Sequence, residues 1–320
     1  MAIPGVWFSP REDVMRSVLP PMAAVPGKFN EATLGRRRFI ELLESVRRGD
    51  APPSASAIAA RLSALPLVTN IEASIADHGY HRNLQNVFSN LSTFDTGGWR
   101  ARQHGLIYGS VAPGAVGRSM TTKFLSTMPK GGEFAFLETG LIASTKGWAG
   151  GEGAEKVENA CVGYMLDDRS HYFMADYPSR MIRDLNGLGE LTLPERRRAL
   201  NLRDRIVELA ITKYNHQPRR KLSLGRRGRR KVLVCDQAGG DASILFGRAT
   251  PESFTRMLSA AIAEHPEAEI YVKIHPDSIA NSTRYKPHFA AEDLAHPNVT
   301  VLREVANPID LLRAVDQVYV

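Results

Sequence analysis

VLVCDQAGGDASILFG, at residues 232–247, carries the strongest fold signal in the chain, and KIHPD at residues 273–277 repeats it. In each case a short apolar run ends in polar residues. Thr250 followed by Pro251 predicts a helix start between the two runs. The order strand, helix, strand predicts a right-handed crossover within a parallel sheet. Apolar residues recur at helical spacing along this helix, namely Phe254, Met257, Leu258, Ala261 and Ile262.

The same alternation continues to the last residue. We predict strands at EIYVKI (269–274), VTVLRE (299–304) and QVYV (317–320), and a short helix at PIDLLRAV (308–315). These elements make a Rossmann-like domain at residues 232–320. No helix follows QVYV to cover its apolar face, so we expect this domain to be truncated, with an open sheet edge.

The amino-terminal half, residues 1–215, is predicted as a second Rossmann-like domain with weaker patterning. Helices are expected at 33–48 and 56–64, and strands at LIYGSV (106–111) and FAFLETG (134–140). CVGYMLDDRSHYF (161–173) predicts two strands joined by a turn at residues 167–169. There Asp167 and Asp168 form either a solvated turn, which we favour, or a metal-binding acid pair.

A further helix is predicted from Thr192, which has the capping-box spacing with Glu195, to about Tyr214. The length follows from apolar residues at helical spacing, namely Ala199, Leu202, Ile206, Leu209 and Ala210.

The positive charge of the chain is local. The whole chain has a net charge of +7, while residues 219–231 contribute +8 without one acidic residue, so the remainder carries −1. We interpret residues 216–231 as a basic linker, either solvated or in contact with an anionic membrane surface. Because no aromatic residue interrupts the run, no nucleic-acid partner is expected. The eight cations are Arg219, Arg220, Lys221, Arg226, Arg227, Arg229, Arg230 and Lys231.

Composition excludes several classes of protein. No apolar run approaches the 18 or so residues that span a bilayer, and the first residues lack a secretory signal pattern, so we expect a cytoplasmic protein. Two cysteines, Cys161 and Cys235, have no metal-ligand spacing. We expect both to be small core residues, and neither a disulfide framework nor a zinc site.

Ionisable residues at the predicted strand ends are the site candidates. Asp236 follows VLVC, and Lys273 and His275 end the next strand. Because the carboxyl ends of parallel strands share one sheet edge, we expect these three side chains to face one crevice. Asp236 is either a nucleophile, base or hydroxyl binder, or a cap of the following loop. Gln237, Gly240, Asp241 and Ser243 lie in that loop, Pro276 fixes the chain after His275, and Glu138 ends a strand in the other half.

These segments together resemble the KpsC/LipA-type capsule polysaccharide biosynthesis proteins. VLVCDQAGGDASILFG looks like the family's strand-DQ-x-x-GD block, and AEIYVKIHPD like its His-Pro segment. MLDDRSHYFMADYPSRM (165–181), FLETGLIAS (136–144) and KYN (213–215) also match, in the family's order.

The resemblance implies a GT-B-like fold with two Rossmann-like domains and a retaining transfer of Kdo, or a related acidic sugar, from a CMP donor. It makes Asp236 the candidate nucleophile and Glu138 the acid/base. His275, Lys273, Pro276, Gln237, Gly240, Asp241 and Ser243 would bind the nucleotide sugar. The acceptor would be lipid-linked or a saccharide, with no metal or cofactor besides the donor. The alternative is a non-catalytic component of capsule assembly or export that keeps the fold.

Overall fold

The computed structural model describes residues 60, 62, 66–71, 81–94, 99, 103–109, 119–129, 133–145, 160–187, 189–213, 215–280, 282–283, 285–304 and 306–320. The predicted helix at 33–48 and most of that at 56–64 lie outside the described residues. Among those described, no helix combines the length and hydropathy needed to cross a bilayer.

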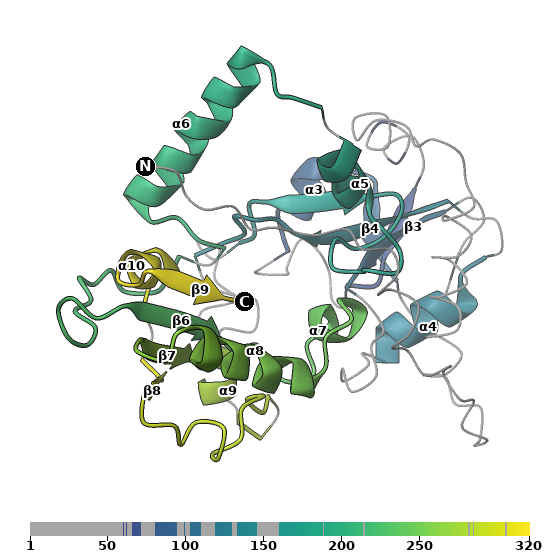
Figure 1. Cartoon of the computed structure of the whole chain (residues 1–320). Helices are drawn as coiled ribbons and strands as arrows, with labels where there is room; N and C mark the ends of the chain where they lie inside the picture. Colours follow the sequence, from purple (N-terminus) through teal and green to yellow (C-terminus); the bar gives the residue numbers. More distant parts are fainter. Residues whose placement is uncertain are drawn as a thin grey trace. The chain divides into compact units, whose positions relative to one another are not determined.

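The amino-terminal half contains a five-stranded sheet of order β2-β1-β3-β4-β5, of which β3 and β4 are labelled in Figure 1. All neighbours are parallel except β5, which runs antiparallel to β4. The strands predicted at 106–111 and 134–140 are confirmed as β3 and β4. The elements are β1 (Leu67–Thr69), α3 (Leu84–Val87), β2 (Leu91–Thr93), β3 (His104–Tyr108), α4 (Ser119–Thr127), β4 (Phe134–Thr139), β5 (Tyr164–Asp167) and α5 (Arg180–Gly187).

Alternate residues of these strands enter two apolar clusters, one on each face of the sheet. Ile107 and Phe136 pack in the cluster that holds Phe124 of α4. Leu106 and Leu137 point the other way, into the cluster that holds Leu84 of α3. Because both faces are covered, every residue of β3 is buried.

The prediction of two strands within residues 161–173 is confirmed for the first strand, β5, and is wrong for the second. β5 ends at Asp167, whose Oδ1 accepts the backbone N–H groups of Arg169 (2.8 Å) and Ser170 (3.2 Å). Its Oδ2 accepts the N–H of Met181 at 3.3 Å. The prediction of a solvated turn also fails, since Asp167 is only 9% exposed and Asp168 pairs with Arg180 at 2.7 Å. These bonds satisfy the loop's backbone in place of a second strand.

The carboxyl-terminal half is the predicted parallel sheet, with strand order β8-β7-β6-β9 (Figure 1). In chain order this is 3-2-1-4, the order of a Rossmann-type sheet, with the topological switch point between β6 and β9. The elements are β6 (Lys231–Cys235), α7 (Ala242–Phe246), α8 (Pro251–Glu264), β7 (Glu269–Lys273), α9 (Pro276–Ala280), β8 (Val299–Leu302), α10 (Pro308–Arg313) and β9 (Gln317–Tyr319).

Helices cover both faces of this sheet. Phe254, Leu258 and Ala261 of α8 are buried against one face, and Met257 and Ile262 pack beside them, so the predicted stripe of this helix is confirmed. The opposite face packs against Leu311 of α10. The polar groups that follow β6 and β7 are thereby held on a rigid layer.

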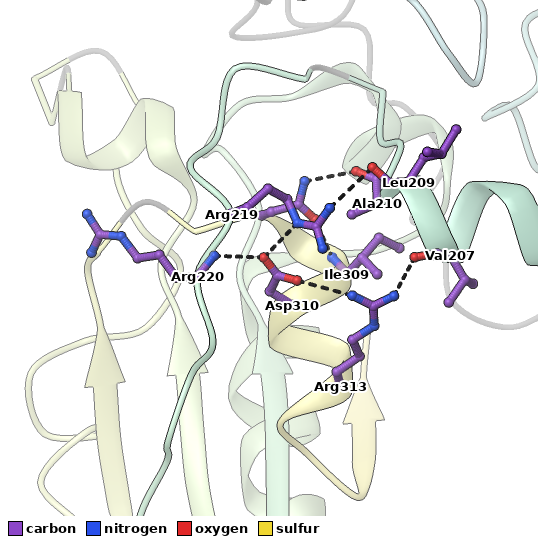
Figure 2. A network of polar contacts seen from close by, with 9 residues as sticks. Val207, Leu209, Ala210, Arg219, Arg220, Ile309, Asp310 and Arg313 are labelled. Atoms are coloured by element: carbon purple, nitrogen blue, oxygen red, sulfur yellow. Dashed lines mark hydrogen bonds and ion pairs between the residues drawn. The ribbon is translucent and has the colours of Figure 1, made fainter.

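Helix α6 (Leu193–Leu209) is shorter than predicted. The capping box between Thr192 and Glu195 is present, but the helix ends at Leu209, and Ala210 has a left-handed backbone with φ 50°. No residue of α6 is buried, and Leu202 is 56% exposed. Tertiary contacts explain the early end, because Arg313 donates to the carbonyl of Val207, Arg219 to Leu209 and Asn307 to Ala210 (Figure 2).

The basic segment is exposed as predicted, yet it is attached to the carboxyl-terminal sheet. Leu222 and Leu224 pack against the cluster that contains Leu311. Acidic residues distant in sequence pair with three of the cations, because Arg219 contacts Asp310 (3.0 Å), Arg220 contacts Glu304 (3.5 Å) and Arg229 contacts Glu267 (3.3 Å). Figure 2 shows Asp310 between Arg219, Arg220 and Arg313. The basic segment is therefore packed against the carboxyl-terminal sheet, and its last residue, Lys231, is the first residue of β6.

Candidate functional site

The predicted cluster at the strand ends is present. Cys235 pairs with Lys273 across β6 and β7, and the N–H of Asp236 donates to the carbonyl of Lys273 at 2.9 Å. His275 follows two residues later. Asp236, Lys273 and His275 therefore lie on one carboxyl edge, beside the switch point, as the sequence predicts. Their catalytic and binding roles stay predictions.

Asp236 is bonded through one carboxylate oxygen. Oδ1 accepts the N–H of Gln237 (2.9 Å), the N–H of His288 (3.3 Å) and the imidazole Nδ1 of His288 (3.0 Å). Oδ2 is buried and has no hydrogen-bond partner among the described residues. The Asp236 side chain is 0% exposed and that of His288 6%. His288 stacks on Phe254 of α8, with ring centroids 4.0 Å apart and planes inclined by 10°.

His288 escaped the sequence analysis. It lies in the connection between α9 and β8, 52 residues from Asp236, without an apolar run before it. Nothing in a strand-end pattern points to it. The backbone explains its placement, since Gly239 donates to the carbonyl of Lys286 at 3.1 Å. A Cβ on Gly239 would stand 2.3 Å from that oxygen, so glycine permits this close approach of the two loops.

The His275 ring is pre-positioned. Its Nδ1 accepts the N–H of Asp277 at 3.1 Å, at the start of α9 where Pro276 is the first residue. In the neutral ring the proton is therefore on Nε2, which can donate to a ligand. Burial lowers the pKa of His275, while the carboxylates of Asp277, Asp241 and Asp236 act in the opposite direction.

Lys273 and Cys235 are neighbours across the strand pair. Burial is the main cause that lowers the pKa of Lys273, and nearby Cys235 opposes it. Burial likewise raises the pKa of the Cys235 thiol. Lys273 Nζ donates to the carbonyl of Ile274 at 2.8 Å, so a bound anion would have to compete for this ammonium group.

The loop after β6, which contains Gly239 and Gly240, leads into α7. Gly240 has φ 82°, a backbone conformation that favours glycine. Asp241 Oδ1 accepts the N–H of Ser243 at 2.8 Å, which closes the turn into α7. Gln237 is exposed. Within the described ranges, no three His, Cys, Asp or Glu side chains gather closely enough to hold a metal ion.

Glu138 is the last residue but one of β4, in the other half. Its Oε1 accepts the N–H (2.8 Å) and the hydroxyl (3.2 Å) of Thr139. Burial raises the pKa of Glu138, whereas the bonds to Thr139 and the charge of Lys213 lower it, and Asp241 raises it further. Glu138 thus feels the charge of Asp241 from the loop after β6. The predicted approach of the Glu138 and Asp236 carboxylates to within roughly 10 Å stays a prediction.

Segment 165–181 contacts α7, the helix that follows the loop after β6, and the residues just beyond α7. Ala175 donates to the carbonyl of Phe246 at 2.9 Å, and Arg248 pairs with Asp176. Phe246 also packs against the cluster of the amino-terminal sheet, with Phe173 and Tyr177 beside it. Two motifs far apart in the sequence therefore meet at α7.

Comparison with known proteins agrees with this arrangement. Residues 175–320 match the family model described as "Capsule polysaccharide biosynthesis protein". The chain is 34% identical over 161 residues to "Capsule polysaccharide modification protein LipA" of Neisseria meningitidis serogroup A, and 33% identical over 162 residues to that of serogroup B. Each alignment covers 48% of this chain and 22% of the relative, so the chain spans about a fifth of the relatives' length.

A solved structure extends the likeness into the amino-terminal half. It is "Thermosulfurimonas dismutans KpsC, beta Kdo 2,4 transferase", with a TM-score of 0.63 and 27% identity. The alignment covers 79% of this chain and 73% of that one. Both sheets and this likeness show a GT-B-like α/β fold, and the chain is similar to KpsC/LipA-type proteins of capsule polysaccharide biosynthesis, with the family-model match confined to residues 175–320.

Proposed function

We propose that this protein is a glycosyltransferase of capsule polysaccharide biosynthesis, which transfers Kdo or a related acidic sugar from a CMP donor with retention of configuration. The observation that carries the proposal is the placement of Asp236, Lys273 and His275 on one carboxyl edge beside a switch point. The likeness to a solved structure titled as a beta Kdo 2,4 transferase supports the sugar.

In the first proposed step an oxygen of Asp236 attacks the anomeric carbon. The bond between that carbon and the phosphate oxygen breaks, and CMP leaves with the electron pair. In the second step the acceptor hydroxyl attacks the same carbon from the opposite face and gives its proton to Glu138. The bond to Asp236 breaks and the carboxylate is restored. Burial raises the pKa of Glu138, which would help this carboxylate to hold the proton that it takes from the acceptor.

Basic groups at the same edge would bind the donor. The Nε2–H of His275 and the ammonium of Lys273 would contact the CMP phosphate, while Gly240 would let the backbone approach it. Gln237, Asp241, Ser243 and Pro276 would complete the donor side. The ammonium of Lys273 and the Nε2–H of His275 would stabilise the charge of departing CMP in place of a metal ion, so EDTA should leave turnover unchanged.

The remaining partners follow from the same proposal. The acceptor would be lipid-linked or a saccharide, and the protein would act in the cytoplasm. Residues 219–231 would give peripheral contact with the inner membrane through those cations that lack an ion-pair partner among the described residues, such as Arg227. Three of the eight cations are already paired within the protein, so we expect this contact to be weak.

One observation favours a second candidate, a non-catalytic component of capsule assembly that keeps the fold. The Asp236 side chain is 0% exposed and bonded to His288. Because Oδ2 is buried, a sugar can reach it only if the residues that cover it move. If they never move, Asp236 only fixes the loop, as in the loop-cap alternative.

Calorimetric titration with CMP separates the two candidates. The transferase should bind CMP, and Lys273→Ala should weaken the affinity at least about tenfold through loss of one charged hydrogen bond. Lys221→Ala, an exposed lysine of the basic segment, is the matched control and should bind as the wild type does. Absence of CMP binding at millimolar concentration would overturn the proposal.

A further inference from the structure

We infer that His288 is a positioning residue, which holds Asp236 by Oδ1 so that Oδ2 is the oxygen that forms the bond to the sugar. The inference rests on the proposed function, since it assigns a support to the proposed nucleophile. It adds a residue from the α9–β8 connection to a site otherwise built from strand ends.

The hydrogen bonds of the carboxylate are unequal. Oδ1 accepts three N–H groups, at 2.9, 3.3 and 3.0 Å, whereas Oδ2 accepts none from the described residues. An oxygen with three donors has little electron density left for attack on carbon. An uncomplexed oxygen in the same carboxylate keeps its lone pairs available. The asymmetry therefore selects Oδ2 as the reacting atom.

The His288 ring is itself fixed, which a positioning role requires. Its near-parallel stack on Phe254, at 4.0 Å, ties it to α8 and thus to the core of the sheet. An ionised carboxylate oxygen can only accept, so the ring Nδ1 donates to Oδ1 and carries the proton. The ring Nδ1–H and the backbone N–H of His288 both donate to Oδ1 of Asp236, and these two hydrogen bonds restrict rotation of the carboxylate.

The two loops also meet through their backbones. Gly239 lies against Lys286, two residues before His288. This contact joins the two loops through backbone atoms, without involving the side chain of His288 or of Asp236. The ring's Nδ1 bond can therefore be removed while the loop stays docked, which makes a side-chain test possible.

The test uses the whole chain and needs no acceptor. The rate of CMP release from CMP-Kdo is measured, with a protein-free blank subtracted. His288→Leu removes the donor, whereas His288→Asn places an amide N–H near the position of Nδ1. We expect His288→Leu to lower kcat at least about a hundredfold while KM for the donor and affinity for CMP stay within about threefold. We expect His288→Asn to recover kcat to within about tenfold of wild type.

The matched control is His265→Leu. His265 caps the carboxyl end of α8 and contacts Tyr319, so it is a packed histidine just before the amino end of β7. The His265→Leu variant should keep the kcat of the wild type. The inference would be overturned if His288→Leu had the kcat of the wild type, or if His288→Leu and His288→Asn lost kcat equally. In either case, CMP release by the wild type would still support the proposed function.

A second measurement covers the case in which His288→Leu does not fold. Long-range 15N–1H spectra of the wild type should show His288 protonated at Nδ1, and this signal should change in Asp236→Ala. A ring protonated at Nε2 alone would overturn the inference. If the wild type neither binds CMP nor releases it from the donor, the proposed function fails, and the hydrogen bond then serves only to hold the loop.

Discussion

Replacing Asp236 by alanine and by asparagine separates its hydrogen bonds from its charge. Alanine leaves two donors of His288 without an acceptor, in a place where the His288 side chain is 6% exposed. At about 1–2 kcal/mol for each buried unsatisfied donor, the free energy of unfolding should fall by about 3 kcal/mol. For a chain of 320 residues, with an unfolding entropy of about 2.1 cal/mol/K per residue, that corresponds to a melting temperature lower by roughly 4–5 °C.

Asparagine keeps an acceptor at Oδ1 and replaces Oδ2 by an amide that has no partner there. We expect a cost of about 1 kcal/mol, with CMP binding retained. Because the charge on the attacking group is lost, sugar transfer should fall at least about a thousandfold, measured as CMP release on the same preparation.

Urea unfolding followed by circular dichroism gives the stabilities, and calorimetry gives the CMP affinity. An Asp236→Ala variant as stable as wild type would refute the described hydrogen bonds. An Asp236→Asn variant with normal turnover would refute the nucleophile and leave Asp236 as a loop cap.

Three further outcomes test other parts of the structure. Burial raises the pKa of Glu138 above its ordinary value of 4.5, so the folded protein should lose stability as pH rises from about 4.5 through that raised pKa. Urea midpoints of Glu138→Gln should fall less over this range, while those of the exposed control Glu292→Gln should track the wild type. Leu202→Glu should change the free energy of unfolding by less than about 0.5 kcal/mol because Leu202 is 56% exposed, whereas Leu258→Ala, at a residue 2% exposed, should cost about 2–5 kcal/mol. The basic segment should float with anionic vesicles at low salt and detach at 1 M salt, where the screening length is about 3 Å; equal binding to neutral vesicles would argue against it.

The carboxyl-terminal sheet was predictable from local patterns. Its strands and helices each have an apolar period that is visible within 4 to 14 residues. Once these elements alternate, the right-handed crossover leaves little freedom, and the carboxyl ends of β6 and β7 meet at one edge. Asp236, Lys273 and His275 could therefore be brought together before any coordinates were known.

The same kind of pattern gave the wrong end for α6. The spacing of Ala199, Leu202, Ile206, Leu209 and Ala210 predicts a helix to about Tyr214, but the helix ends at Leu209. Apolar spacing is a local signal and says nothing of contacts from other elements. Arg219, Asn307 and Arg313 donate to the last carbonyl groups of this helix and to that of Ala210, and they come from other elements.

Local sequence thus specified the elements of the carboxyl-terminal half and the edge at which its ionisable residues gather, because helix and strand periods and strand ends are short-range properties. The docking of the basic segment through Asp310, the buried turn at Asp167 and the contact of His288 with Asp236 depended on tertiary structure. These interactions join residues up to 91 positions apart or use backbone groups that carry no sequence signal. Such contacts form only when the packed sheets bring their loops together, and no periodicity records them.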